Sequence, residues 1–161
     1  MKSSHAPGQM LVVDDNRVNR LLLTRALQQH GHRVSNAENG RIAMEMLRSE
    51  RFDVLLLDID MPEMNGFEVL EALLVDSNLR DIPVVMTSAS DELDRVVKCI
   101  EMGADDYLVK PLNPILLRAR VNASLERNAC ATSSANFSTR LPPRRWLSNC
   151  CGKGLHWAVS L

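Results

Sequence analysis

Short apolar segments alternate along the chain with stretches whose apolar residues recur with the period of a helix. This alternation restricts the possible folds. Val54–Leu57 is the clearest segment: it is apolar without alternation, which is typical of a strand buried on both faces of a sheet. The other expected strands are Met10–Val13, Arg33–Ala37, Val84–Met86 and Tyr107–Val109. Strands that alternate with helices predict βα units, and consecutive βα units form a parallel sheet with helices on both faces.

The helical stretches lie between these segments, and their apolar residues recur three and four positions apart. Gly31 and Gly103 stand where the first and fourth helices are expected to end, and Pro114 stands where the last is expected to begin. The apolar stripes that define the five helices are Val18/Leu21/Leu22/Leu27, Ile42/Ala43/Met46/Leu47, Val69/Leu70/Leu73/Leu74, Leu93/Val96/Val97/Ile100 and Leu117/Val121/Leu125.

A change of composition near Arg127 predicts the domain boundary. Residues 9–127 hold all five βα units and are expected to form one domain. Residues 128–161 carry both tryptophans, no acidic residue and no regular period, so we expect a poorly ordered tail. This tail is too short for an ordinary output domain, which suggests a stand-alone domain or a product whose native continuation was lost, for instance by a frameshift.

Composition excludes several classes of protein. Residues 1–127 carry 15 basic and 20 acidic side chains, which argues against direct nucleic-acid binding by this domain. No apolar run approaches the ~20 residues of a membrane span, and the start has no signal-peptide core, so the expected location is cytoplasmic. The four cysteines form no disulfide framework, and Cys150, Cys151 and His156 match no usual zinc spacing.

Charged residues follow three of the expected strands directly. Asp14 and Asp15 follow the first strand, Asp58 the third and Lys110 the fifth. Ligands of an open α/β sheet bind outside the carboxyl ends of the strands, so these side chains are expected to meet. Three converging carboxylates need a cation, and Mg²⁺ is suited because it prefers oxygen ligands. With Lys110 the site would neutralise a phosphoryl group, and Asp58 is the best nucleophile candidate.

Each residue has a simpler explanation when it is taken alone. Asp14 or Asp15 is favoured as a cap of the first helix, and Asp58 as a turn residue at the end of a strand. Lys110 alone is more often a solvated lysine, and Ser88, at the end of the fourth strand, is usually a loop hydroxyl. The hypothesis depends on the combination, in which an acidic pair, a lone acid and a lysine each follow an apolar strand.

Three motifs together resemble the receiver domain of two-component response regulators. They are Leu-Val-Val-Asp-Asp-Asn at residues 11–16, Asp-Ile-Asp-Met-Pro-Glu-Met-Asn-Gly at 58–66, and Glu-Met-Gly-Ala-Asp-Asp-Tyr-Leu-Val-Lys-Pro at 101–111. The resemblance covers roughly residues 9–127 with every element in order. It implies a flavodoxin-like, doubly wound α/β fold of five βα units with the strand order 2-1-3-4-5.

The resemblance also implies the roles of the site residues. Asp58 would be the phospho-acceptor and a metal ligand, Asp15 a direct ligand of Mg²⁺, and Asp14 a ligand through water. The backbone carbonyl of Asp60 would complete the metal site. Lys110 would contact the phosphoryl group, and its bond to the following proline is expected to be cis.

Two more residues are implied to form a switch. Ser88, favoured over the adjacent Thr87 because it precedes Ala89, would move its hydroxyl to a phosphoryl oxygen. Tyr107 would then turn inward. The surface that responds would be the one formed by the fourth helix, the fifth strand and the fifth helix, whose charges of both signs suit a symmetric homodimer.

The implied function is a phosphorelay switch. A sensor histidine kinase or phosphotransfer protein would supply the phosphoryl group, and the domain would catalyse its own phosphorylation and dephosphorylation instead of turning over a substrate. A haloacid-dehalogenase-like phosphatase is an alternative, but its Asp-x-Asp motif usually follows the first strand, and Pro62 stands where that family has Thr or Val. A phosphate-independent receiver used only for binding would not need the complete set of site residues, which is Asp14, Asp15, Asp58, Ser88 and Lys110.

Overall fold

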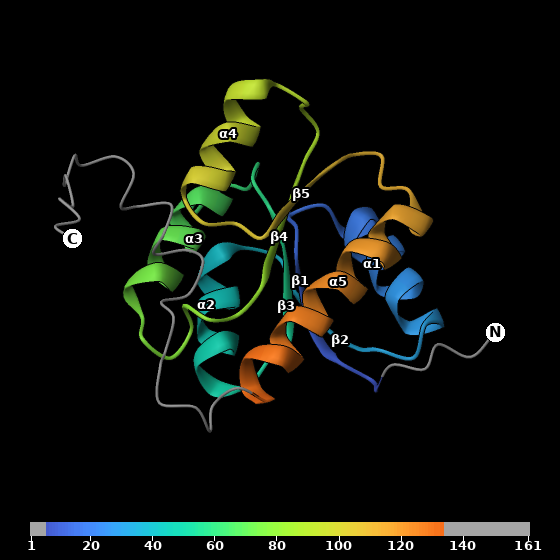
Figure 1. Cartoon of the computed structure of the whole chain (residues 1–161). Helices are drawn as coiled ribbons and strands as arrows, with labels where there is room; N and C mark the ends of the chain where they lie inside the picture. The colour runs from blue at the N-terminus through green and yellow to red at the C-terminus, as the bar shows by residue number, and fades with distance from the viewer. Residues whose placement is uncertain (1–5, 134–161) are drawn as a thin grey trace, which may run out of the picture.

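Five parallel strands form one sheet in the order β2-β1-β3-β4-β5 (Figure 1). The computed structural model describes residues 6–133, and side chains as far as residue 129. The strands are β1 (Gln9–Val13), β2 (Arg33–Ala37), β3 (Val54–Asp58), β4 (Val84–Ser88) and β5 (Asp106–Val109). The helices are α1 (Arg17–Gln29), α2 (Gly40–Ser49), α3 (Gly66–Val75), α4 (Leu93–Glu101) and α5 (Pro114–Ser133). The fold class and strand order predicted from the sequence are confirmed.

The helices cover both faces of the sheet, and each face has its own hydrophobic core. Side chains alternate along a strand, so Leu55 and Leu57 of β3 point to one face, and Val54 and Leu56 to the other. The first pair lies in the core with residues of α2, α3 and α4, and the second in the core with residues of α1 and α5. Figure 1 shows these two groups of helices on opposite sides of the sheet. β3 is therefore buried on both faces, which explains its unbroken apolar sequence.

Asparagine side chains set the beginnings of several helices. Asn16 accepts hydrogen bonds from backbone amides of the first turn of α1, and Asn39 does the same for α2. Asn65 and Glu68 form a reciprocal capping box at the start of α3. Gly31, with φ of +86°, follows α1 at the predicted stop, because a left-handed conformation there favours glycine.

The last helix passes the expected domain boundary without a break. α5 continues through Arg127 to Ser133, so the first residues of the segment expected to be poorly ordered are helical. Leu125 packs on the core between α5 and the sheet, and the Asn128 side-chain amide lies 3.4 Å from the Asp53 carbonyl oxygen. Residues 134–161, the rest of the expected tail, lie outside the described residues. Within residues 6–133 no helix is long and apolar enough to span a membrane.

Candidate functional site

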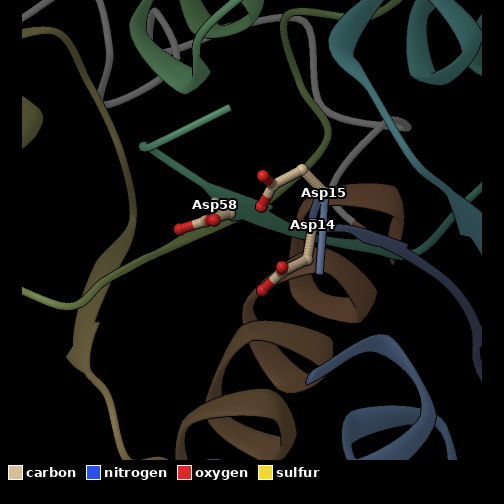
Figure 2. A group of neighbouring side chains, drawn as sticks. All are labelled: Asp14, Asp15 and Asp58. Carbon is tan, nitrogen blue, oxygen red and sulfur yellow. The ribbon is translucent and has the colours of Figure 1, made fainter. Parts of the chain in front are cut away.

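Three carboxylates meet where β1 and β3 end side by side. Asp14 and Asp58 are buried and Asp15 is exposed. Each offers an oxygen, and these oxygens all lie within 4.8 Å of one another (Figure 2). The convergence follows from the topology, since β1 pairs with β3 in register and the two strands end at the same edge of the sheet.

Lys110 reaches two of these carboxylates from the end of β5. Its Nζ lies 2.7 Å from Asp14 Oδ2 and 3.0 Å from Asp58 Oδ2. Burial alone would lower the pKa of Lys110, but hydrogen bonds and charge attraction from Asp14 and Asp58 outweigh it and raise the pKa above its ordinary value. The ammonium is therefore charged at neutral pH. The Lys110–Pro111 bond is cis, as the resemblance implied.

Asp58 is the carboxyl group whose ionisation the site perturbs. The pKa of Asp58 is raised to about 6: burial is the largest cause and the charge of Asp14 adds to the rise, while Lys110 and the backbone N–H of Asp60 oppose it. Its Oδ1 atom is buried, and no group among the described residues donates a hydrogen bond to it. A buried carboxylate oxygen without a donor is costly, which marks this atom as a point where a cation or an incoming group would bind.

Asp14 has both of its carboxylate oxygens engaged. Oδ1 accepts a hydrogen bond of 2.8 Å from the Asn16 amide, and Oδ2 is the atom bound by Lys110. The cap of α1 is Asn16 and neither aspartate, so capping does not explain the acidic pair. Asp15 is exposed, and its carboxylate makes no such contact within residues 6–133.

A divalent cation fits this set of donors. The three carboxylates carry three negative charges against one ammonium, and one buried oxygen has no partner within the described chain. Hard oxygen donors of this kind suit Mg²⁺, which is usually held by one or two carboxylates together with phosphate oxygens. Mg²⁺ would supply charge neutralisation for a phosphoryl group at this edge of the sheet.

The loop after β3 passes very close to the acceptor. A Cβ atom on Gly66 would lie 2.4 Å from the Asp58 carbonyl oxygen, so only glycine fits at this position. The Gly66 amide donates to the Ile59 carbonyl oxygen at 3.0 Å, and Glu63 adopts a φ of +65°. This tight turn holds the backbone of Asp60 beside the Asp58 carboxylate.

Ser88 lies at the end of β4, but its hydroxyl does not contact Asp58. The Ser88 Oγ atom is 3.4 Å from Asp60 Oδ2, 3.3 Å from Arg95 Nη1 and 3.2 Å from the Ser90 amide nitrogen. These contacts place Ser88 on the Asp60 side, and the alternation of side chains turns Thr87 to the other side. The partner that the sequence reasoning missed is Arg95. An acid at Asp60 and a basic residue near the start of α4 were its only signals.

Tyr107 is half-buried and packs against the core on the α2–α3–α4 face. Its hydroxyl donates a hydrogen bond to the Ser90 carbonyl oxygen. Ser90 therefore contacts both Ser88 and Tyr107, because its amide donates to Ser88 Oγ.

Known proteins place these features in one family. The family model of the response regulator receiver domain matches residues 10–122. Protein PilH of Pseudomonas aeruginosa is 38% identical over 118 residues, which are 73% of this chain and 98% of that protein. The two-component response regulator ORR11 of Oryza sativa is 39% identical over 110 residues, 68% of this chain and 75% of that protein. The chain matches only 50% of the probable transcriptional regulator ycf27 of Guillardia theta, at 38% identity.

Solved structures agree with the family. The chemotaxis protein CheY4 of Vibrio cholerae is 32% identical, with a TM-score of 0.66 over 76% of this chain and 98% of that one. The receiver domain of a histidine kinase from Syntrophus aciditrophicus is 30% identical, with a TM-score of 0.70 over 83% of this chain and 98% of that one. The fold and the site thus define a phospho-accepting switch domain. The chain belongs to the response regulator receiver domain family of two-component signalling.

Receiver domains of this family accept a phosphoryl group on an aspartate, bind Mg²⁺ at an acidic cluster and interact with histidine kinases or phosphotransfer proteins. The acidic cluster of this chain is Asp14, Asp15 and Asp58. The alternatives of a haloacid-dehalogenase-like phosphatase and of a phosphate-independent receiver are not favoured by the family.

Proposed function

We propose that Asp58 is the phospho-acceptor of this chain and that its phosphorylation requires Mg²⁺. The observation that carries the proposal is the asymmetry of its carboxylate: Oδ2 is bound by Lys110 at 3.0 Å, and the buried Oδ1 has no donor among the described residues. A nucleophilic oxygen must be free to attack, and the other oxygen must be held for the attack to have a fixed direction. Asp14 and Asp15 also carry carboxylates, but both oxygens of Asp14 already have hydrogen-bond partners and Asp15 is exposed.

Mg²⁺ is proposed to bind Asp15 and Asp58 directly, Asp14 through water, and the backbone carbonyl of Asp60. The chain's own residues then supply the rest of the chemistry. Lys110 balances charge on the acceptor and on the transferred group, and the Gly66 turn holds the Asp60 backbone in place. Phosphoryl transfer needs mainly such positioning and charge neutralisation.

The experiment is phosphorylation by acetyl phosphate, read as intact mass. We expect the wild type to gain one phosphoryl group in Mg²⁺ and none in EDTA, and Asp58→Asn to gain none. Asp81→Asn, an exposed acid away from the site, is the matched control and should label like the wild type. Labelling of Asp58→Asn at the wild-type level would overturn the acceptor assignment, and labelling in EDTA would overturn the metal requirement.

Ser88 and Tyr107 are proposed to carry the signal to the face formed by α4, β5 and α5. That face exposes Val97, Ile100 and Val109, which suits a partner or a second copy of the chain. Two of its charges are already paired within the chain, since Arg120 Nη1 lies 3.1 Å from Asp106 Oδ2. A homodimer across this face is therefore proposed to depend on its apolar residues, and sedimentation of Ile100→Asp against the wild type tests it.

The donor is proposed to be the phosphohistidine of a sensor kinase or phosphotransfer protein. Residues 9–127 are proposed to be the receiver domain, and the cytoplasmic location stays a prediction. The helix α5 crosses the end of this range, so the folded unit is proposed to extend to Ser133.

A further inference from the structure

Asp60 and Arg95 form a two-point ion pair beside the Ser88 hydroxyl. Arg95 Nη2 lies 3.0 Å from Asp60 Oδ1, and Nη1 lies 3.1 Å from Asp60 Oδ2. Such parallel contacts fix the guanidinium and the carboxylate in one plane. Asp60 belongs to the loop after β3 and Arg95 to α4. The pair therefore joins this loop to this helix next to Ser88, the last residue of β4.

The same two side chains and the Ser90 amide together take up the hydrogen-bonding capacity of Ser88. A serine hydroxyl has one proton and two lone pairs. The proton is directed to Asp60 Oδ2 at 3.4 Å, and the oxygen accepts from Arg95 Nη1 at 3.3 Å and from the Ser90 amide at 3.2 Å. Ser88 therefore has no proton left for another acceptor while these contacts hold.

We propose that the Asp60–Arg95 pair is a latch that positions Ser88 away from the acceptor and competes with a phosphoryl group on Asp58 for the Ser88 hydroxyl proton. This inference rests on the proposed function, in which Ser88 donates to the phosphoryl group. Arg95 is a positioning residue in this scheme, because it acts on the reacting group only through Ser88 and Asp60. The latch lowers the fraction of molecules in which Ser88 is available to the phosphoryl group.

The latch extends to Tyr107 through Ser90. The Ser90 amide donates to Ser88 Oγ, and the Ser90 carbonyl accepts from the Tyr107 hydroxyl. When Ser88 moves away, the Ser90 amide loses its acceptor. Ser90 then changes position, and the Tyr107 hydroxyl that is bonded to it is affected. The competition is modest, because the Asp60 and Arg95 side chains are 47% and 35% exposed and the three contacts of Ser88 are long.

A plain structural role for the ion pair makes a different prediction. If the pair only holds α4 against the loop, its removal lowers stability. Any change in the affinity for a phosphoryl group is then the same with and without the Ser88 hydroxyl. If the pair is a latch, its removal raises this affinity, and the gain requires the Ser88 hydroxyl. The dependence on Ser88 therefore separates the two roles.

The experiment is a titration of Asp60→Ala/Arg95→Ala with beryllofluoride, a phosphoryl analogue, at saturating Mg²⁺. The double variant removes one acid and one base, so its net charge equals that of the wild type, and the residue 60 backbone is kept. Arg48→Ala/Asp76→Ala is the matched control, since it removes a 3.9 Å ion pair between α2 and the end of α3. Binding is followed by ¹⁵N NMR of the Ser90 and Tyr107 amides.

We expect the latch variant to bind beryllofluoride roughly two- to ten-fold more tightly than the wild type and the control. Its Ser90 amide resonance should also shift before any beryllofluoride is added. In a Ser88→Ala background, the same double substitution should change the affinity by less than about two-fold. Unchanged or weaker binding in the latch variant, or an equal gain without the Ser88 hydroxyl, would overturn the inference. A wild type that fails to bind beryllofluoride would instead overturn the proposed function.

Discussion

Lys110 crosses the end of β4 to lie 3.0 Å from one oxygen of Asp58, while the other oxygen of this carboxylate has no donor among the described residues. The same ammonium lies 2.7 Å from Asp14, so one positive charge serves two buried carboxylates. Burial is the main physical reason for the raised pKa of Asp58, and the remaining negative charge on Asp14 adds to it. Together these two causes make the site responsive to pH and to a divalent cation, which the first two predictions test.

Asp58 is predicted to destabilise the fold as the pH rises. Its pKa is about 6 in the fold against a reference value of 3.8, so the folded chain binds more protons between these values. The free energy of unfolding should therefore fall as the pH increases from about 4 to about 6 and level off above. Without Mg²⁺, Asp58→Asn should be more stable than the wild type at pH 8 by roughly 2–3 kcal/mol.

Denaturant unfolding of both chains in EDTA, from pH 4.5 to 8, measures this difference. The gain of Asp58→Asn should shrink toward the acidic end, where wild-type Asp58 is protonated. Asp15→Asn is the control, because that side chain is exposed. A stability difference that does not vary with pH would show that burial does not perturb Asp58 in the fold.

Mg²⁺ is predicted to stabilise the wild type through the acidic cluster. A ligand that binds only the folded chain adds RT ln(1 + [L]/Kd), or about 1.4 kcal/mol at ten times the dissociation constant. Asp15→Asn and Asp58→Asn should each lose most of this gain, and Asp81→Asn should keep it. Thermal unfolding against Mg²⁺ concentration gives the measurement, and a gain retained in both site variants would place the ion elsewhere.

Much of the fold and site follows from local sequence patterns. The apolar run of β3 reflects burial directly, so strands and helices were predictable to within a few residues. The buried face of α1 was predicted less well: Leu27 is buried as expected, but Val18, Leu21 and Leu22 of the predicted stripe are exposed, and Leu23 is buried in their place. Asp14, Asp58 and Lys110 were predictable because residues after parallel strands meet at one edge of the sheet.

Contacts that depend on the rotation of a helix were not predictable in this way. The pairing of Arg95 with Asp60 requires that α4 turn this side chain toward the loop after β3, and its periodicity alone fixes only the apolar face. The end of α5 was likewise not fixed by the apolar pattern. Ala129–Ser133 has no apolar stripe, and the helix continues there because residues 128–133 contain no proline or glycine to stop it.

The chain beyond Ser133 is predicted to be dispensable for the stability of the domain. A truncation after Ser133 keeps the Leu125 packing and the Asn128–Asp53 contact, so the free energy of unfolding should change by less than about 1 kcal/mol. A truncation after Ser124 removes both contacts and should cost several times more. A loss well above about 1 kcal/mol for the truncation after Ser133, measured by denaturant unfolding, would show that residues 134–161 contribute to stability.

The response to phosphate is predicted to need the Ser88 hydroxyl. A phosphoryl group can shift a conformational equilibrium only if it interacts differently with the two states, and the hydrogen bond from Ser88 provides such a difference. A hydrogen bond to a charged group contributes roughly 1.5–3 kcal/mol, enough for about a ten- to hundred-fold shift in population. The structure supplies the path onward, since Ser90 contacts both Ser88 and Tyr107.

Ser88→Ala should therefore keep phosphorylation at Asp58 but lose most of the phosphate-induced NMR shifts at Tyr107 and along α4. Ser88→Thr, which keeps a hydroxyl, is the matched control and should retain them. Spectra of each variant with and without the phosphoryl group measure the effect, and intact mass confirms that the two variants are phosphorylated to the same extent. Because Asp58 and Lys110 are unchanged in both variants, a difference between them isolates the hydroxyl. Shifts of wild-type size in Ser88→Ala would show that the signal reaches Tyr107 by a route that does not pass through Ser88.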